Sequence, residues 1–264
     1  MVDDEPPVDD DIAPQQRWGC VERKNYNEVW SATSPILTGD IDYMGGNQFC
    51  IFDDPTGSTT GDIHILEIIP KQVLIVKTVK SYLTNIDPRG ICYDGCFIHV
   101  IYKDNQVDPP DYSYEQIDIN GSVVREIKSI KFPGEVEGMC CFIEDSSEYF
   151  AIVERGTPED HGDSLHILDR NFSLVKSFVM GDVPLGTAFG IIHDGMNFVV
   201  ANKGDAVARP GFKIIDPVST QTISSVKGSF NYNGIAFDGL QIYYNMDPVQ
   251  LTLGEETDPP IGEA

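Results

Sequence analysis

An internal repeat is the feature of this sequence that most restricts its fold. The unit is a short apolar run, an Asp-Gly turn and a second apolar run, seen at residues 90–100, 190–200 and 234–244. Asp-Gly tolerates the positive φ of tight hairpin turns, so each copy predicts two antiparallel strands. Weaker copies begin at Gly138 and Asp40, which places the five starts at 40, 90, 138, 190 and 234. Periods near 50 residues are typical of propellers and solenoids.

The second half of each unit indicates two more strands. A loop follows each hairpin, and the strand after it ends in an acidic residue, namely Glu67, Asp118, Asp169 or Asp216. These acids lie 51, 51 and 47 residues apart, and a further apolar strand follows each of them. Each unit therefore reads as one four-stranded propeller blade.

The two ends of the repeat region carry complementary halves of a blade. Residues 18–32 resemble the third and fourth strands of a unit, whereas residues 234–244 supply only the first two. Pairing these halves closes the ring and removes open sheet edges. We therefore expect an all-β fold, a five-bladed β-propeller with two-plus-two strand closure. Six blades is the alternative, if residues 246–253 belong to an extra unit.

The motif Gly-Ile-x-x-Asp-Gly, followed by an aromatic-aliphatic strand, resembles the repeats of NHL-type propellers and their relatives. Residues 234–239, Gly-Ile-Ala-Phe-Asp-Gly, are the copy most similar to the Gly-Ile-Ala-Val-Asp pattern of that superfamily. The resemblance covers about residues 18–245 and concerns blade architecture. It implies a propeller, a fold that serves both enzymes and pure binding modules.

The chain is strongly acidic, with 42 Asp and Glu against 18 Lys and Arg and a formal charge of −24. An acidic tail is expected over residues 1–16, the propeller over 17–245 and a second acidic tail over 246–264. The tails hold six and five acids and no Lys or Arg, which leaves 31 acids minus 18 bases, or −13, for the body. Such a chain repels phosphate backbones, so nucleic acid is not an expected partner. The expected partner is a protein with a basic surface, and a glycan is the alternative ligand.

Neither a membrane span nor a secretory leader is expected. The sequence has no apolar run of about 18 residues, and its acidic start lacks the basic and apolar regions of a signal peptide. We expect the protein in the cytoplasm or incorporated in a particle such as a virion. Cys92 and Cys96 flank a repeat turn without a second ligand pair at zinc-site spacing, so structural thiols are expected. No metal site or cofactor is expected, with calcium as the one open alternative.

Propeller geometry predicts where binding residues lie. Long loops between the second and third strands, together with both tails, are expected on one face, and the Asp-Gly turns on the other. Binding residues concentrate on long loops, and the entrances of the inner strands face the central channel. The candidate binding residues from these two places are Asp40, Arg89, Glu137, Asp108, Asp111, Glu159, Asp160 and Asn233.

The sequence contains no recognisable catalytic set. No Gly-x-Ser-x-Gly elbow is present, and His193 takes a position held by aromatic residues in sister units, which predicts packing between blades. The preferred interpretation is a non-enzymatic binding module in a larger assembly, such as a virion or phage-tail adhesion protein. An intracellular protein–protein scaffold is another reading. The enzymatic alternative is a propeller hydrolase, a glycosidase or a calcium-dependent lactonase. Its channel carboxylates would come from Asp40, Asp87, Glu135 and Glu137.

Overall fold

The structure, a computed structural model, is built of strands. It describes residues 17–22, 28–33, 38–53, 61–69, 72–82, 86–104, 111–156, 163–180, 188–202, 210–227 and 231–247. The strands are β1 (Arg17–Glu22), β2 (Glu28–Thr33), β3 (Thr38–Gly45), β4 (Gln48–Asp53), β5 (Asp62–Ile69), β6 (Gln72–Ser81), β7 (Ile86–Tyr93), β8 (Ile98–Asp104), β9 (Asp111–Ile117), β10 (Val123–Ile130), β11 (Glu135–Glu144), β12 (Ser147–Arg155), β13 (Ser164–Asp169), β14 (Leu174–Val179), β15 (Ala188–His193), β16 (Phe198–Asn202), β17 (Gly211–Ile215), β18 (Thr222–Lys227), β19 (Asn231–Phe237) and β20 (Gln241–Asp247). None of these described segments forms a helix that could cross a membrane.

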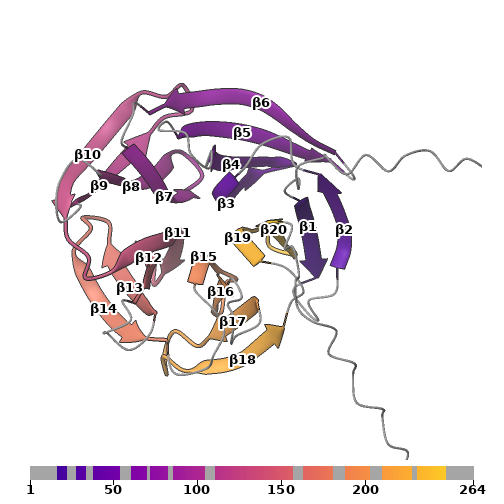
Figure 1. Ribbon diagram of the computed structural model, residues 1–264. Coiled ribbons are helices and arrows are strands. Elements are labelled where there is room, and N and C mark those ends of the chain that lie inside the picture. The colour runs from indigo at the N-terminus through magenta and orange to yellow at the C-terminus, as the bar shows by residue number, and fades with distance from the viewer. Residues whose placement is uncertain are drawn as a thin grey trace, which may run out of the picture.

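The strands form five four-stranded sheets around a common axis (Figure 1). The orders are β3-β4-β5-β6, β7-β8-β9-β10, β11-β12-β13-β14, β15-β16-β17-β18 and β19-β20-β1-β2. Strands β3, β7, β11, β15 and β19 lie nearest the axis, and β6, β10, β14 and β18 lie on the rim. The expectation of an all-β propeller is confirmed.

The fifth sheet joins the two ends of the described chain. β1 runs antiparallel to β20, with Arg17 opposite Met246 and Glu22 opposite Gln241. The first two strands of this sheet thus come from the end of the repeat region and the last two from its start. This pairing gives an edge of β20 the backbone partners that it would otherwise lack.

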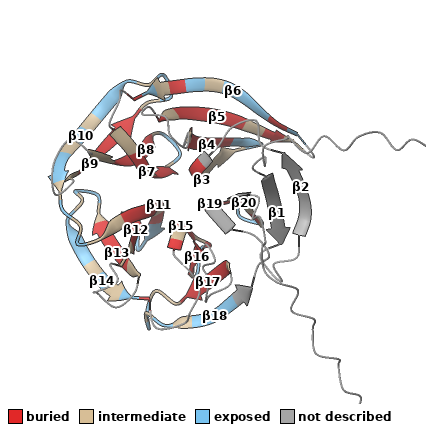
Figure 2. Cartoon of the chain, in the orientation of Figure 1, coloured by how far each residue is buried: buried red, intermediate tan, exposed pale blue. Residues whose placement is uncertain are grey.

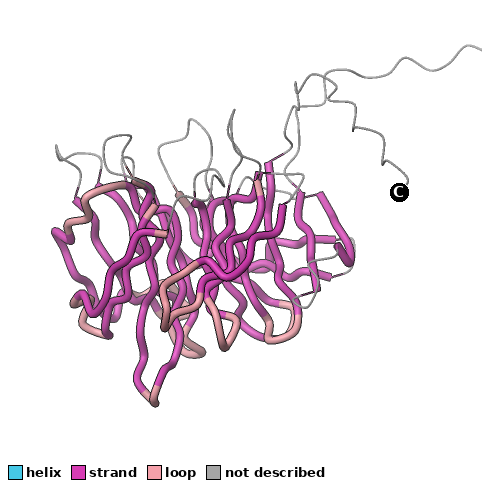
Figure 3. Tube along the Cα trace, turned by 90° about the horizontal axis from the view of Figure 1, so that it is seen from below, coloured by secondary structure: helices cyan, strands magenta, loops and turns pink. Residues whose placement is uncertain are grey.

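The Asp-Gly turns adopt the conformation that their sequence requires. Gly95, Gly195 and Gly239 have φ of 96°, 89° and 95°, a region that glycine enters without steric cost. The preceding aspartate caps each turn, as where Asp194 Oδ1 accepts the backbone N–H groups of Met196 and Asn197 at 2.9 and 2.7 Å. These turns lie on one face of the ring, called the turn face below (Figure 3). The opposite ends of the strands form the loop-end face.

The core lies between neighbouring sheets: middle strands such as β16 and β17 are buried on both sides, whereas the rim strands β10 and β14 are largely exposed (Figure 2). One cluster joins Val153 and Leu165 of the third sheet to Ile191 and Val200 of the fourth. The His193 ring stacks on Phe142 of the preceding sheet, with ring centroids 4.9 Å apart. The prediction that His193 packs between blades is therefore confirmed.

Three of the periodic acids, Asp118, Asp169 and Asp216, cap turns, whereas Glu67, which was expected to end its strand, lies inside β5, because that strand continues in pairing to Ile69. Asp118 Oδ1 accepts the N–H groups of Asn120 and Ser122, both at 2.8 Å, and Asp169 does the same one sheet later. Next to each of these three caps, a cation from the rim strand of the preceding sheet, Lys77, Arg125 or Lys176, reaches a backbone carbonyl. Lys77 Nζ is 2.6 Å from the Ile119 carbonyl oxygen. These acids are therefore explained by the architecture.

Candidate functional site

The axis of the propeller is filled at the level where the inner strands come closest. Four units have a glycine at this position, and the remaining unit has Asp40. A Cβ added to Gly138 would lie 2.8 Å from Gly190 Cα, and one on Gly190 would lie 3.0 Å from Gly234 Cα. The glycines let the strands approach this closely, and the single carboxyl group occupies the space that they leave.

Asp40 is held by backbone amides of two other sheets. Its Oδ2 accepts the N–H of Ile91 at 3.3 Å and that of Met139 at 3.1 Å. The residue is 1% exposed. Burial raises the pKa of this carboxyl well above its usual range, although the Met139 and Ile91 amides lower it. Asp40 therefore ties β3 to β7 and β11 from inside the ring.

Asp42 makes a second link of the same kind, closer to the turn face. Its Oδ2 accepts the N–H of Tyr93 at 2.7 Å, and its Oδ1 accepts that of Tyr43 at 2.8 Å. Burial raises the pKa of Asp42 to about 7, against the effect of these two amides. Asp42 thus joins the first sheet to the second, and Asp40 joins it to the second and the third.

A group of charged side chains lies at the loop-end face, where the second and third sheets meet. We call it the mouth network, and its members are Asp87, Arg89, Lys103, Glu135, Glu137 and Arg155. It contains three acids and three bases, so its formal charges cancel. Each acid is within ion-pair distance of at least one base.

Arg89 is the centre of the network on the second sheet. Its Nε and Nη2 donate to Asp87 Oδ2 at 2.9 and 2.6 Å, and its Nη1 donates to Glu137 Oε2 at 3.3 Å. Burial alone would lower the pKa of the guanidinium, but Asp87 and Glu137 raise it above the ordinary value. Arg89 is therefore held as a fixed cation between two carboxylates.

The third sheet completes the network with a cation of its own. Arg155 pairs with Glu135 and reaches Glu137 Oε1 at 3.3 Å. Lys103 Nζ donates to Glu135 Oε1 at 2.9 Å across the gap between the sheets. Burial, followed by the nearby Arg89, lowers the pKa of Lys103. Glu137 thus lies between Arg89 and Arg155.

The structure brings some of the sequence-predicted residues together and separates others. Arg89 and Glu137 share the mouth network, as do Asp87 and Glu135 of the hydrolase alternative. Asp40 is enclosed at the axis, and Asp111 pairs with Lys131 at the start of β9. Three predicted residues lie outside the described residues: Asp108, Glu159 and Asp160. Asn233 belongs to β19, with its side chain outside the description.

Sequence reasoning missed the two cations that complete the network. Lys103 lies opposite Asp87 in the β7–β8 register, and Arg155 lies opposite Glu135 in the β11–β12 register. Cross-strand pairs of opposite charge stabilise sheets. Aligning each hairpin outward from its turn would therefore have predicted both cross-strand pairs from the sequence.

The arrangement limits the chemistry that these carboxylates can perform. A glycosidase pair needs one carboxyl with a raised pKa and another that faces substrate, and calcium needs several free oxygen ligands. In the described part of the mouth network, every carboxylate already contacts Arg or Lys. The geometry favours a fixed, neutral charge pattern over a reactive pair.

Comparisons with known proteins give a fold likeness. No protein-family model matches the sequence, and no curated protein matches it. Among solved structures, the Myceliophteria thermophila Cps50 (Swd1) β-propeller domain is 14% identical, with a TM-score of 0.43 over 78% of this chain and 60% of that one. The Dos1 propeller is 10% identical, with a TM-score of 0.46 over 82% and 53%. The N10 neuraminidase-like protein of A/little yellow-shouldered bat/Guatemala/060/2010 is 14% identical, with a TM-score of 0.49 over 86% and 84%. This chain thus spans little more than half of the Cps50 and Dos1 chains.

Proposed function

We propose that this chain is a non-enzymatic, five-bladed propeller that binds a protein partner with a basic surface through its loop-end face. In this proposal it serves as one subunit of a larger assembly, such as a virion or a phage tail. Its blade motifs, which resemble NHL-type repeats, support a scaffold that presents loops.

The observation that carries the proposal is that every charged group of the mouth network is paired. Its three acids and three bases neutralise one another, and Glu137 is held by a cation from each of two sheets. A network of this kind positions strand ends rigidly. Rigid strand ends that carry variable loops are a common basis for binding surfaces.

The charge of the chain supports a basic partner. Of the total formal charge of −24, the 11 acids of residues 1–16 and 246–264 supply −11, so the body carries −13. Residues 157–162, between β12 and β13, add Glu159 and Asp160 without a base. Complementary charge accelerates association and selects against acidic partners.

The enzymatic alternative is a propeller hydrolase that uses Glu135 or Asp87 at the mouth. It predicts that Glu135→Ala abolishes turnover of a glycan or lactone while thermal stability changes little. The binding proposal predicts no turnover in the wild type, and a loss of stability in Glu135→Ala, because Arg155 and Lys103 lose their shared partner.

A pair of charge reversals tests the binding face. Glu159→Lys/Asp160→Lys changes the segment between β12 and β13, whose described ends lie at the loop-end face, and Glu67→Lys/Glu144→Lys makes the same change of charge near the turn-face ends of β5 and β11. Size-exclusion chromatography of tagged protein from its native source reports assembly, and thermal melts report folding. We expect the first variant to leave the assembly and the second to remain in it. Equal behaviour of the two folded variants would contradict the proposed face.

A further inference from the structure

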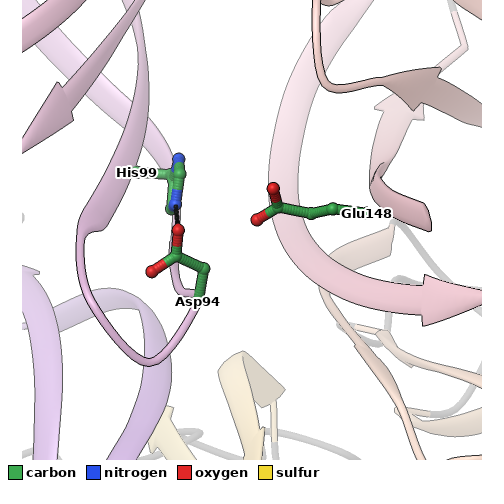
Figure 4. A group of neighbouring side chains, drawn as sticks. All are labelled: Asp94, His99 and Glu148. Atoms are coloured by element: carbon green, nitrogen blue, oxygen red, sulfur yellow. Dashed lines mark ion pairs between the residues drawn. The ribbon is translucent and has the colours of Figure 1, made fainter. Parts of the chain in front are cut away.

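Three side chains come together on the turn face, at the boundary between the second and third sheets. Asp94 lies in the β7–β8 turn, His99 in β8 and Glu148 in β12, and one potential ligand atom from each lies within 4.8 Å of the other two. His99 Nε2 is 2.9 Å from Asp94 Oδ2. Figure 4 shows the Glu148 carboxylate directed at this pair from the neighbouring sheet.

The repeat explains the aspartate but not the histidine. Asp94 Oδ1 accepts the N–H groups of Cys96 and Phe97 at 2.7 and 2.6 Å, as Asp194 does in its own turn. Five residues after the aspartate stands His99 in the second sheet, whereas the fourth sheet has Val199. The turn therefore forms without an imidazole, and Asp94 Oδ2 is not needed for capping.

His99 is a buried base whose Nε2 faces the Asp94 carboxylate. It is 2% exposed, and its Nδ1 lies 2.7 Å from the Tyr114 hydroxyl, which fixes the ring. Its Nε2 is in ion-pair contact with Asp94 Oδ2 at 2.9 Å, and no hydrogen-bond partner beyond this contact is found for it among the described residues. When Nδ1–H donates to the Tyr114 oxygen, the Nε2 lone pair points toward the two carboxylates. Metal-binding histidines are oriented by a partner on the other ring nitrogen in the same way.

Glu148 reaches this place because its hairpin is long. The β11–β12 pairing continues to Ile143 opposite Glu148 and Glu144 opposite Ser147. Glu148 also lies 3.4 Å from Arg170 Nε, but the Arg170 side chain is 69% exposed. An exposed pair of this kind is weak, so a cation can displace Arg170.

We propose that Asp94, His99 and Glu148 bind one divalent first-row transition-metal ion, for which zinc is the best match, and that the ion clamps the second sheet to the third. Zinc bonds to imidazole and carboxylate are about 2.0–2.2 Å long, which places adjacent donor atoms roughly 3 Å apart. The separation of His99 Nε2 and Asp94 Oδ2 fits this geometry. Calcium and magnesium prefer oxygen ligands alone, so the buried imidazole selects against them. A water molecule would complete a four-coordinate site, since the described chain supplies three ligands.

Calorimetric titration of the full chain with zinc chloride, after treatment with a chelator, tests the site. We expect one ion per chain and a rise in melting temperature on binding, since the ion binds only the folded state. Glu148→Gln should weaken the affinity at least tenfold. The matched pair is Asp94→Asn and Asp194→Asn, because both disturb the same turn hydrogen bonds but only the first removes a ligand.

Cys96→Ser is the control for thiol binding, since Cys96 is an exposed free cysteine beside Asp94. We expect this variant and Asp194→Asn to bind zinc as the wild type does. The proposal is overturned if no stoichiometric binding occurs, if Glu148→Gln binds like the wild type, or if Cys96→Ser or Asp194→Asn weakens zinc as much as Asp94→Asn. The test does not depend on the proposed partner.

Discussion

Asp40 is expected to hold the propeller together from its axis, and its replacement gives the sharpest test of the fold's construction. Asp40→Ala removes the acceptor of two buried amides, those of Ile91 and Met139. A buried amide without a partner costs about 1–3 kcal/mol, so the free energy of unfolding should fall by about 2–6 kcal/mol. Asp40→Asn keeps a carbonyl oxygen in place and should stay within about 1 kcal/mol of the wild type near pH 4.

The same residue predicts a dependence on pH. The folded pKa of Asp40 is raised well above that of the unfolded chain, which is about 3.9. Above pH 4 the folded state therefore holds a proton that the unfolded state releases. This contribution to stability is complete below pH 4 and declines as pH rises toward the folded pKa. Asp40→Asn lacks this proton, so its stability relative to the wild type should increase from pH 4 to pH 8.

Urea denaturation followed by circular dichroism, at several pH values, measures both effects. The slope of the free energy against urea checks that the variants unfold a similar surface. The reasoning fails if Asp40→Asn costs as much as Asp40→Ala. It also fails if the difference between Asp40→Asn and the wild type is the same at pH 4 and pH 8.

Three further changes are expected to have measurable effects. Arg89→Met should lower the free energy of unfolding by about 1–3 kcal/mol, because Glu137 loses one of its cations. A double-mutant cycle with Glu137→Gln should show that the two losses are coupled, and additive losses would contradict the pair. Gly138→Ala should destabilise the folded protein by at least about 2 kcal/mol in thermal or urea melts, since the added Cβ would meet the Gly190 backbone. Gly195→Asn should be nearly neutral, because the position has open space and asparagine tolerates its turn conformation. With a folded pKa of about 7, Asp42 favours the folded state fully below pH 4 and loses this effect as pH rises to 7, so Asp42→Asn should flatten that part of the stability profile.

The strand pattern was predictable from sequence because its causes are local. Asp-Gly turns require a positive φ that the chain adopts at Gly95, Gly195 and Gly239, and apolar alternation follows from strands that bury residues. The pairing of β1 with β20 was foreseen from two half-units at the ends of the repeat region. The period of the acids is readable from the sequence, but the role of Asp118, Asp169 and Asp216 as turn caps appears only in their hydrogen bonds.

The candidate site was harder to predict because it depends on how sheets approach one another. The repeat alignment already placed Asp40 at a glycine position, but only the contacts among the inner strands show that one carboxyl fills the axis. The Lys103–Glu135 contact crosses the boundary between the second and third sheets, whereas Arg155 pairs with Glu135 and Glu137 inside the third sheet. Glu148 lies 49 residues after His99 in sequence, and no spacing rule brings residues of adjacent sheets together.

The central claim is that this propeller works as a subunit bound to a basic protein partner. Its most direct test is the mass of the wild-type protein isolated gently from its native source, by size-exclusion chromatography with light scattering, at low and high salt. We predict a stable complex well above the 29.2 kDa of the single chain, with a basic protein that dissociates as salt rises. Elution of the chain alone at its own mass under low salt would contradict the claim.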